Sequence, residues 1–95
     1  MKDPNNLAVL QVAKTAWEQS GKQTVHLQAT GKVPAIPAHC VRAGMTRLYN
    51  YGYKGEIVGT SFSSSWATFT IREGDSDIVH SRKHKLETLI PIAIS

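Results

Sequence analysis

A succession of short alternating segments, separated by turn residues, occupies the second half of the chain and constrains its fold most strongly. These segments run over residues 45–51, 55–62, 66–72, 76–81 and 89–94. Glycine, serine and acidic residues lie between them at 52–55, 63–65 and 73–75, and such residues favour tight turns. Short strands at this spacing predict an antiparallel meander that closes into a barrel or packs as a small sandwich.

The segment 66–72 alternates most regularly, and its alternation predicts which side chains are buried. One face carries Ala67, Phe69 and Ile71, and the other carries Trp66, Thr68, Thr70 and Arg72. Trp66 is therefore expected to point outward from the barrel. We expect another element to cover its ring, and the alternative is that Trp66 faces a ligand.

Residues 6–20 are predicted to form an amphipathic helix. Asn5 or Asn6 suits the N-cap, and Gly21 suits the stop. Apolar residues recur at helical spacing and form a wide stripe, which consists of Leu7, Val9, Leu10, Val12, Ala13, Ala16 and Trp17. A stripe this wide predicts packing against the core or a partner subunit, and the helix that ends in Trp17 is the expected cover of Trp66.

Three shorter segments complete the predicted fold. Alternation over 22–29 indicates a half-buried strand, followed by a turn at 30–32. Pro34 and Pro37 lack backbone donors and disfavour helix in the residues before them, so 33–37 is expected to be a connector that crosses the surface. Residues 83–88 are expected to form one helical turn before the last strand.

Length and composition favour a single domain over residues 1–95. With 41% apolar and 19% charged residues the chain is expected to be globular, and its small size favours a homodimer or larger homo-oligomer. No apolar stretch approaches the roughly 20 residues of a membrane span, and residues 1–6 lack a signal-peptide pattern. A cytoplasmic protein without membrane contact is expected. Cys40 is the only cysteine, which excludes a disulfide within one chain.

The formal net charge of +4 is distributed unevenly. No carboxylate side chain lies between Glu18 and Glu56, whereas this stretch carries Lys22, Lys32, Arg42, Arg47 and Lys54. Segregation of this kind can create a positive face that attracts phosphates or an acidic partner. The alternative interpretation is ordinary solvated charge.

The stretch 47–53 contains the first candidate contact residues. Alternation places Arg47, Tyr49, Tyr51 and Tyr53 on one side of an extended segment, and Lys54 follows them. Exposed rings on that side would stack on bases or grip a peptide, and the cation would meet a phosphate or a carboxylate. Alternatively the rings fill the barrel, because tyrosine packs well on pleated surfaces.

A second group of candidate contact residues comprises Trp66 and the cationic run 82–85. Within the run, Arg82, Lys83 and Lys85 would neutralise phosphates and add a salt-dependent affinity for nucleic acid. The alternative is that a run of this length is solvated surface.

Several of these segments together resemble a small SH3-like barrel. The resemblance covers Val41 to Pro91 and rests on the Ala43-Gly44 turn, the strand Gly55-Glu56-Ile57-Val58-Gly59, the serine-rich loop, the 66–72 strand and the acidic turn. Residues 55–59 are locally similar to the type II dihydrofolate reductases, SH3-like barrels that act as tetramers with a Gln-Ile-Tyr stretch lining a shared pore. Here the corresponding strand reads Ile78-Val79-His80-Ser81, so the resemblance implies the barrel and not the reductase activity.

The expected fold class is α+β, mainly β. It consists of the N-terminal helix, the 22–29 strand and a five- or six-stranded SH3-like antiparallel barrel over 41–94.

No arrangement of residues dictates an enzymatic chemistry. His80 and His84 are four residues apart and would share one face of a helix, but the alternation favours a strand at His80. The neighbours His39 and Cys40 are expected to point apart. The serines at 61–65 lack the glycines of a nucleophile elbow, and no phosphate-cradling glycine loop occurs. We therefore expect no catalytic residue, no metal and no cofactor.

The leading hypothesis is a small non-enzymatic binding module whose basic face contacts nucleic acid or an acidic protein surface. Two alternatives stay open. One is a protein-interaction or inhibitory factor of a mobile genetic element, and the other is a small-molecule binder at the axis of a homo-oligomer.

Overall fold

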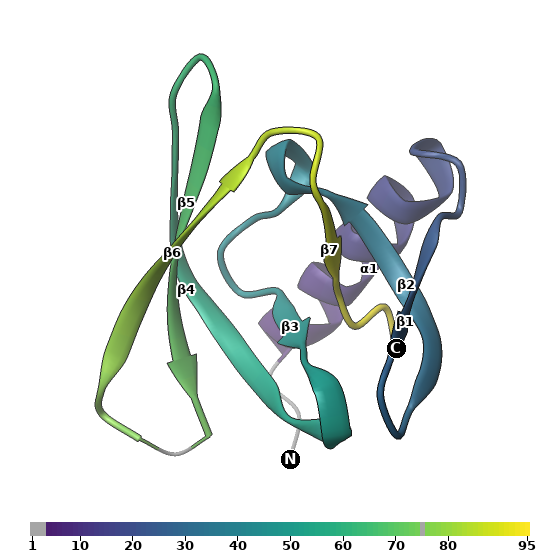
Figure 1. The fold of residues 1–95 in the computed structure, drawn as a ribbon, viewed down its shortest axis with the longest axis horizontal. Coiled ribbons are helices and arrows are strands. Elements are labelled where there is room, and N and C mark those ends of the chain that lie inside the picture. The colour runs from purple at the N-terminus through teal and green to yellow at the C-terminus, as the bar shows by residue number, and fades with distance from the viewer. Residues whose placement is uncertain (1–3, 75) are drawn as a thin grey trace.

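The computed structural model describes residues 4–74 and 76–95, and over these residues the protein is mainly β with one N-terminal helix (Figure 1). The elements in chain order are α1 (Pro4–Gln19), β1 (Thr24–Leu27), β2 (Gly31–Pro37), β3 (Thr46–Leu48), β4 (Lys54–Phe62), β5 (Trp66–Glu73), β6 (Val79–Lys85) and β7 (Leu89–Pro91). Two short 3-10 helices, η1 (Ala38–Cys40) and η2 (Asn50–Gly52), precede β3 and β4. The predicted class, α+β and mainly β, is confirmed.

The described strands form two antiparallel sheets, β1-β2-β7 and β3-β4-β5-β6, and not the single closed barrel that the sequence predicted. The sheets meet at a bridge between Arg47 of β3 and Ile92, where the Ala93 amide donates to the Thr46 carbonyl at 3.0 Å. The barrel stays open because hydrogen bonds attach the turn after β6 to η1. In one of them the Ala38 amide donates to the Thr88 carbonyl at 2.8 Å. This turn directs β7 onto β2, so β6 ends the second sheet with one unpaired edge among the described strands.

The core lies between the two sheets and α1. Its largest buried side chains, each essentially unexposed, come from β2, β4, β5 and the segments around β3 and β7: Ile36, Val41, Met45, Ile57, Phe69, Ile71, Ile90 and Ile92. The predicted inward face of the 66–72 segment, which carries Ala67, Phe69 and Ile71, is confirmed.

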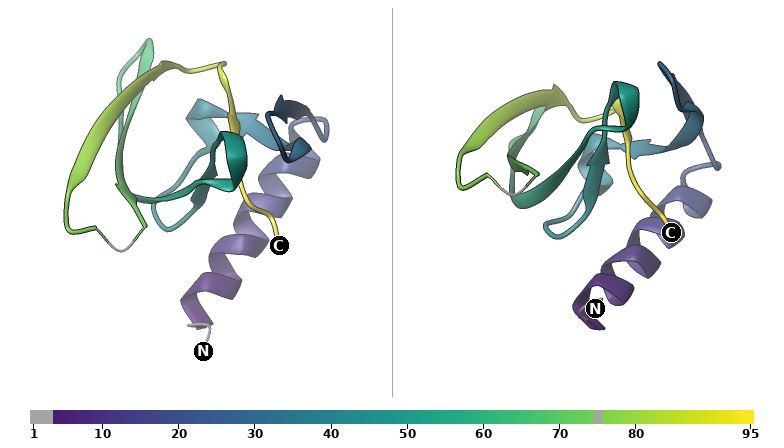
Figure 2. Two further views of the ribbon diagram at one scale, coloured as in Figure 1. Left: turned by 60° about the horizontal axis from the view of Figure 1, so that its bottom comes forward. Right: turned by 90° about the horizontal axis from the view of Figure 1, so that it is seen from below.

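Helix α1 lies beside β2, away from β5 and β6 (Figure 2). It begins at Pro4, so Asn5 and Asn6 lie within the helix and not at the N-cap position where the prediction placed them. Its end follows the prediction, because Gly21 adopts φ +100° and the Lys22 amide donates to the Trp17 carbonyl at 2.8 Å in a Schellman arrangement.

The predicted apolar stripe of α1 is only partly buried. Ala13 is fully buried and Val9, Ala16 and Trp17 pack against the core, whereas Leu7 and Val12 stay exposed. Among the described residues, no helix has the length and apolar character that a membrane span requires.

The proline-containing segment 33–37 is not the predicted surface connector, because it forms most of β2, the middle strand of its sheet. β2 pairs with β1 only up to Pro34 and with β7 only from Ala35 onward. Because β2 changes partner halfway, fewer of its backbone N–H groups have to donate to each neighbouring strand. The two prolines, which lack an N–H group, are therefore tolerated. Ala35 and Ile36 are consequently fully buried.

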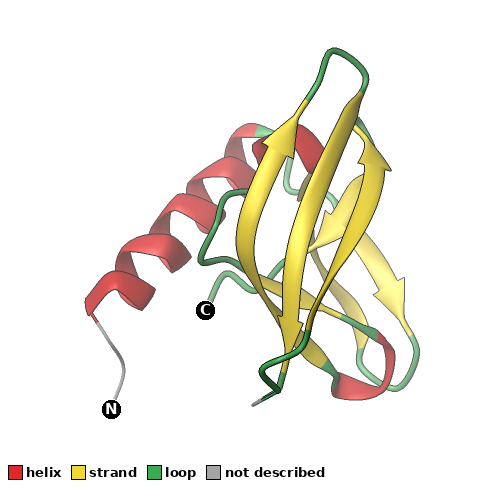
Figure 3. Cartoon of the chain, turned by 90° about the vertical axis from the view of Figure 1, so that its left-hand side faces the viewer, coloured by secondary structure: helices red, strands yellow, loops and turns green. Residues whose placement is uncertain are grey.

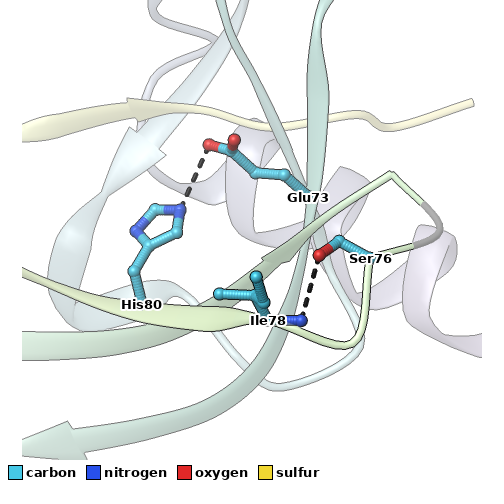
Figure 4. A network of polar contacts seen from close by, with 4 residues as sticks. All are labelled: Glu73, Ser76, Ile78 and His80. Carbon is cyan, nitrogen blue, oxygen red and sulfur yellow. Dashed lines mark hydrogen bonds and ion pairs between the residues drawn. The ribbon is translucent and has the colours of Figure 1, made fainter.

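Three further boundaries differ from the prediction. The 22–29 strand shortens to β1 because Lys22 and Ala29 have positive φ angles of 54° and 73°. The predicted helical turn at 83–88 is wrong, since β6 continues to Lys85 and a turn follows. Strand β6 starts at Val79 and not at Ser76, whose hydroxyl accepts a bond from the Ile78 amide at 3.0 Å (Figure 4). Asp75 of the predicted acidic turn lies outside the described residues.

Candidate functional site

The predicted row of tyrosines on one strand face does not exist. Strand β3 ends at Leu48, and η2 interrupts the extended chain at Asn50–Gly52. Tyr51 adopts left-handed backbone angles of φ 62° and ψ 24°, which breaks the alternation between Tyr49 and Tyr53. Tyr49 is half-buried, whereas 65% of Tyr51 and 72% of Tyr53 are exposed.

Contacts with the β1–β2 turn stabilise η2. The Gln28 amide donates to Oδ1 of Asn50 at 2.9 Å, and the Tyr51 amide donates to the Gln28 carbonyl at 2.8 Å. The Tyr51 hydroxyl also donates to Oε1 of Gln28. Tyr51 is therefore part of a structural joint between two hairpins, and of the three tyrosines only Tyr53 presents an exposed ring without a hydrogen bond among the described residues.

Arg47 and Tyr49 form a pair at the inner side of the four-stranded sheet. Arg47 lies opposite Gly55 of β4, and Gly55 lies opposite Glu73 of β5. All three positions belong to the face that carries the buried Ile71. The guanidinium carbon is 4.7 Å from the Tyr49 ring centroid, and Nη1 of Arg47 donates to the Leu48 carbonyl at 2.6 Å. Burial raises the pKa of Tyr49, an effect that the charge of Arg47 partly offsets.

The cationic run of β6 divides between the two faces of the sheet, which Figure 3 views face-on. Arg82 lies opposite Phe69 and His84 opposite Ala67, so both belong to the buried, inner face. Lys83 lies opposite Thr68 and Lys85 opposite Trp66, so both belong to the outer face. A run that is continuous in sequence is therefore two separate groups in space.

The outer face combines an aromatic ring with cations. Nζ of Lys83 is 4.6 Å from the Trp66 ring centroid, and 38% of Trp66 is exposed. The predicted cover of Trp66 by the helix is therefore wrong: Lys83 lies over the ring, while the Trp17 indole donates to the Gln23 carbonyl at 2.7 Å. At the other end of this face Arg72 pairs with Glu56 at 3.0 Å, and both are substantially exposed.

The inner face of β6 is cationic and partly shielded from water. His84 stacks at a tilt on Phe69, with ring centroids 5.5 Å apart. Burial lowers the pKa of His84, and the charges of Arg47 and Arg82 lower it further. Burial also lowers the pKa of Arg47, to which the charge of Arg82 adds. Arg47 of β3 and Arg82 and His84 of β6 all belong to the inner face of this sheet.

The carboxylate of Glu73 on this face is already engaged. Its Oε1 lies 3.1 Å from Nε2 of His80, and both belong to the same inner surface (Figure 4). Arg47, Arg82 and His84 make no ion pair with a carboxylate of residues 4–74 or 76–95. The Tyr49 hydroxyl and Nδ1 of His80 are buried without a hydrogen-bond partner within the same residues.

The other basic residues of the carboxylate-free stretch are distributed over separate elements. Nη1 of Arg42 donates to the carbonyls of His39 and Val41, at 2.9 Å each, and the guanidinium carbon lies 5.6 Å from the Phe62 ring centroid. Lys54 is exposed at the start of β4, opposite Leu48. Lys22 follows α1 and Lys32 lies in β2.

His39 and Cys40 differ from the expectation that they point apart. Because η1 is a tight helical turn, Sγ of Cys40 lies 3.5 Å from Nδ1 of His39. Both residues line a groove of about 680 Å³ between α1 and η1. Among the described residues, no three His, Cys, Asp or Glu side chains gather as metal ligands would.

The sequence prediction missed the grouping of Arg47, Arg82 and His84. His84 was set aside as a metal ligand and was not counted as a contact residue. The available signal was the alternation of 79–85, since Phe69 and Ile71 on the neighbouring strand define the inner face.

The chain matches no protein-family model, no curated protein and no solved structure.

Proposed function

We propose that the protein is a nucleic-acid-binding module that uses the outer face of β5 and β6. The observation that carries this proposal is the Trp66 ring beside two lysines, with Lys83 over the ring and Lys85 opposite Trp66 on the next strand. Proteins that bind single strands combine an aromatic platform for bases with cations for the backbone.

The surroundings of Trp66 suit an extended strand of nucleic acid. Thr68, Thr70 and Ser81 belong to the same outer face and supply hydroxyl groups that can bond to phosphate or sugar oxygens. Glu56, the carboxylate of β4 on this face, is neutralised by Arg72. The lysines thus remain available for phosphates, and a base that stacks on Trp66 would release Lys83 toward the backbone.

The direct test is fluorescence anisotropy with a labelled single-stranded oligonucleotide over a salt series. W66A is expected to weaken binding roughly fivefold to a hundredfold, because stacking of one base contributes about 1–3 kcal/mol. K83Q/K85Q is expected to reduce the slope of log affinity against log salt by about 1.4, since two phosphate contacts are lost.

The matched control is K22Q/K32Q, which removes the same charge from two exposed lysines outside the four-stranded sheet. It is expected to leave the affinity nearly unchanged. Equal losses in both double variants, or no retention of any oligonucleotide at low salt, would overturn the proposal. A complex with a host protein that survives nuclease treatment would favour a protein-interaction role instead.

We further infer that β2–β7 is an opened small barrel of the SH3-like kind. Support comes from the meander β3-β4-β5-β6, from the register shift between Ile57 and Gly59 that bends β4, and from the Arg47–Ile92 bridge between the sheets. Amide cross-strand contacts measured by NMR would test it, because a flat sandwich without the Arg47–Ile92 contact contradicts this description.

A further inference from the structure

The inner face of the four-stranded sheet carries more basic than acidic groups, and its Glu73 carboxylate is bonded to His80 at 3.1 Å. Arg47 of β3 and Arg82 and His84 of β6 belong to the inner face of the same sheet. Within the described residues, none of the three pairs with a carboxylate. Clustered cations that repel one another and lack counter-charges reduce stability unless an anion is supplied from outside.

The group is also held in place. The Arg47 guanidinium lies on the Tyr49 ring and donates to the Leu48 carbonyl, and the His84 ring lies on Phe69. Gly55 makes room for this arrangement, because a Cβ at that position would lie 3.2 Å from Cε2 of Tyr49. Positioned donors lose little conformational entropy when a ligand binds.

We propose that Arg47, Arg82 and His84 form a binding site for a phosphate group at the open edge of β6. Two guanidinium groups, together with the His84 imidazole when it is protonated, offer several charge-assisted donors to one tetrahedral dianion. A single carboxylate would neutralise only part of this charge. Access is available because Arg82 is exposed, Arg47 and His84 are half-buried, and no described strand pairs with the outer edge of β6.

This site is distinct from the outer-face surface of the proposed function. Neighbouring residues on one strand separate the two, since Arg82 points inward and Lys83 points outward. Loss of a charge on the inner face can therefore be tested separately from loss of a charge on the outer face.

The test is an NMR titration of the intact chain with inorganic phosphate, following the His84 imidazole and the side-chain signals of Arg47 and Arg82. R82Q is expected to weaken phosphate binding about tenfold or more, because a charge-assisted hydrogen bond is lost. K22Q, which removes one exposed charge outside the four-stranded sheet, is expected to weaken it less than about twofold. Circular dichroism would verify that both variants fold, and H84Q, expected to weaken binding severalfold, gives a second variant.

Sulfate serves as a second probe, because it stays a dianion over the pH range in which histidine titrates. The groups that face His84 are Arg47 from β3 and Arg82 from β6, and Glu73 and His80 lie further along the same surface. A bound dianion is expected to raise the pKa of His84, so sulfate binding should strengthen as the pH falls.

The source of the phosphate group is tested with two forms of one oligonucleotide, one with a 5′-phosphate and one with a 5′-hydroxyl. A preference for the phosphorylated form that R82Q abolishes would assign the site to a nucleic-acid end. Binding of inorganic phosphate without such a preference would assign it to a free phosphate. Equal losses in R82Q and K22Q, or no change in the His84 pKa with either anion, would overturn the site, whatever the outer face binds.

Discussion

Arg82 and Lys83 are neighbours in the sequence, carry the same charge and lie in different environments. Arg82 shares the inner face of the sheet with Phe69, His84 and Arg47, where burial lowers the pKa of the surrounding bases. Lys83 lies on the outer face over the partly exposed ring of Trp66. A strand therefore divides a cationic run into two surfaces with separate chemistry.

The difference indicates which ligands suit each face. On the inner face, fixed neighbours and partial exclusion of water favour a small anion with one geometry. On the outer face, a flexible lysine on an exposed indole favours a chain of bases and phosphates that can slide and rearrange. Variants that change one face at a time can break or sharpen this comparison.

The largest expected effect is on the free energy of unfolding, and it compares a buried residue on the inner face of β5 with a residue on its outer face. F69A removes a fully buried ring, so the free energy of unfolding is expected to fall by about 3–5 kcal/mol. T68A, one residue earlier and on the outer face, is expected to change it by less than about 1 kcal/mol. Urea denaturation measures both, and comparable losses would contradict the assignment of the two faces.

A smaller effect is expected for two glycines of β4. A Cβ at Gly55 would lie 2.7 Å from Cγ2 of Ile71, so G55A is expected to lower the free energy of unfolding by about 1–3 kcal/mol. At Gly59 the nearest atom, in Thr70, would be 3.9 Å away, and G59A is expected to be nearly neutral. Thermal denaturation of the two variants measures the difference, and a neutral G55A would mean that Tyr49 and Ile71 do not pack over the inner face as described.

Local pattern was sufficient for the β4–β5 hairpin. Alternation from Trp66 to Arg72 gave the correct buried face, and the serines at 63–65 gave the correct turn. Trp66, Lys83 and Lys85 were already candidate contact residues, and the register of β5 and β6 places them side by side. The ladders of this region join strands that follow one another in the sequence.

Local pattern failed where distant segments decide the backbone. Alternation from Arg47 to Tyr53 presumes an extended chain, yet Gln28 bonds to Asn50 and Tyr51 and stabilises η2. Pro34 and Pro37 indicated a connector, because the change of partner from β1 to β7 that accommodates them has no signal in the segment itself. The positions of Arg47 and Arg82 on the inner face likewise depend on strand pairing that the local sequence does not show. Arg47 is paired with Gly55, and Arg82 is paired with Phe69.

The smallest effect concerns His84 and the pH. Its pKa in the folded state lies below the ordinary value of 6.5, so the unfolded chain takes up a proton first as the pH falls below about 6.5. Stability that His84 contributes above this pH is therefore lost as the pH falls through 6.5 toward the lowered value. H84Q is expected to flatten the fall in stability that urea denaturation measures across this range in phosphate-free buffer.

Two controls show whether the pH effect of H84Q comes from the inner face. H26Q removes an exposed histidine of β1 and controls for the loss of an imidazole elsewhere. Added sulfate should counteract the fall in wild type and not in H84Q, because an anion on the inner face would raise the pKa of His84. An H84Q profile parallel to that of wild type would show that the inner face does not disfavour the charged imidazole, and that Arg82 and Lys83 are more alike than their positions indicate.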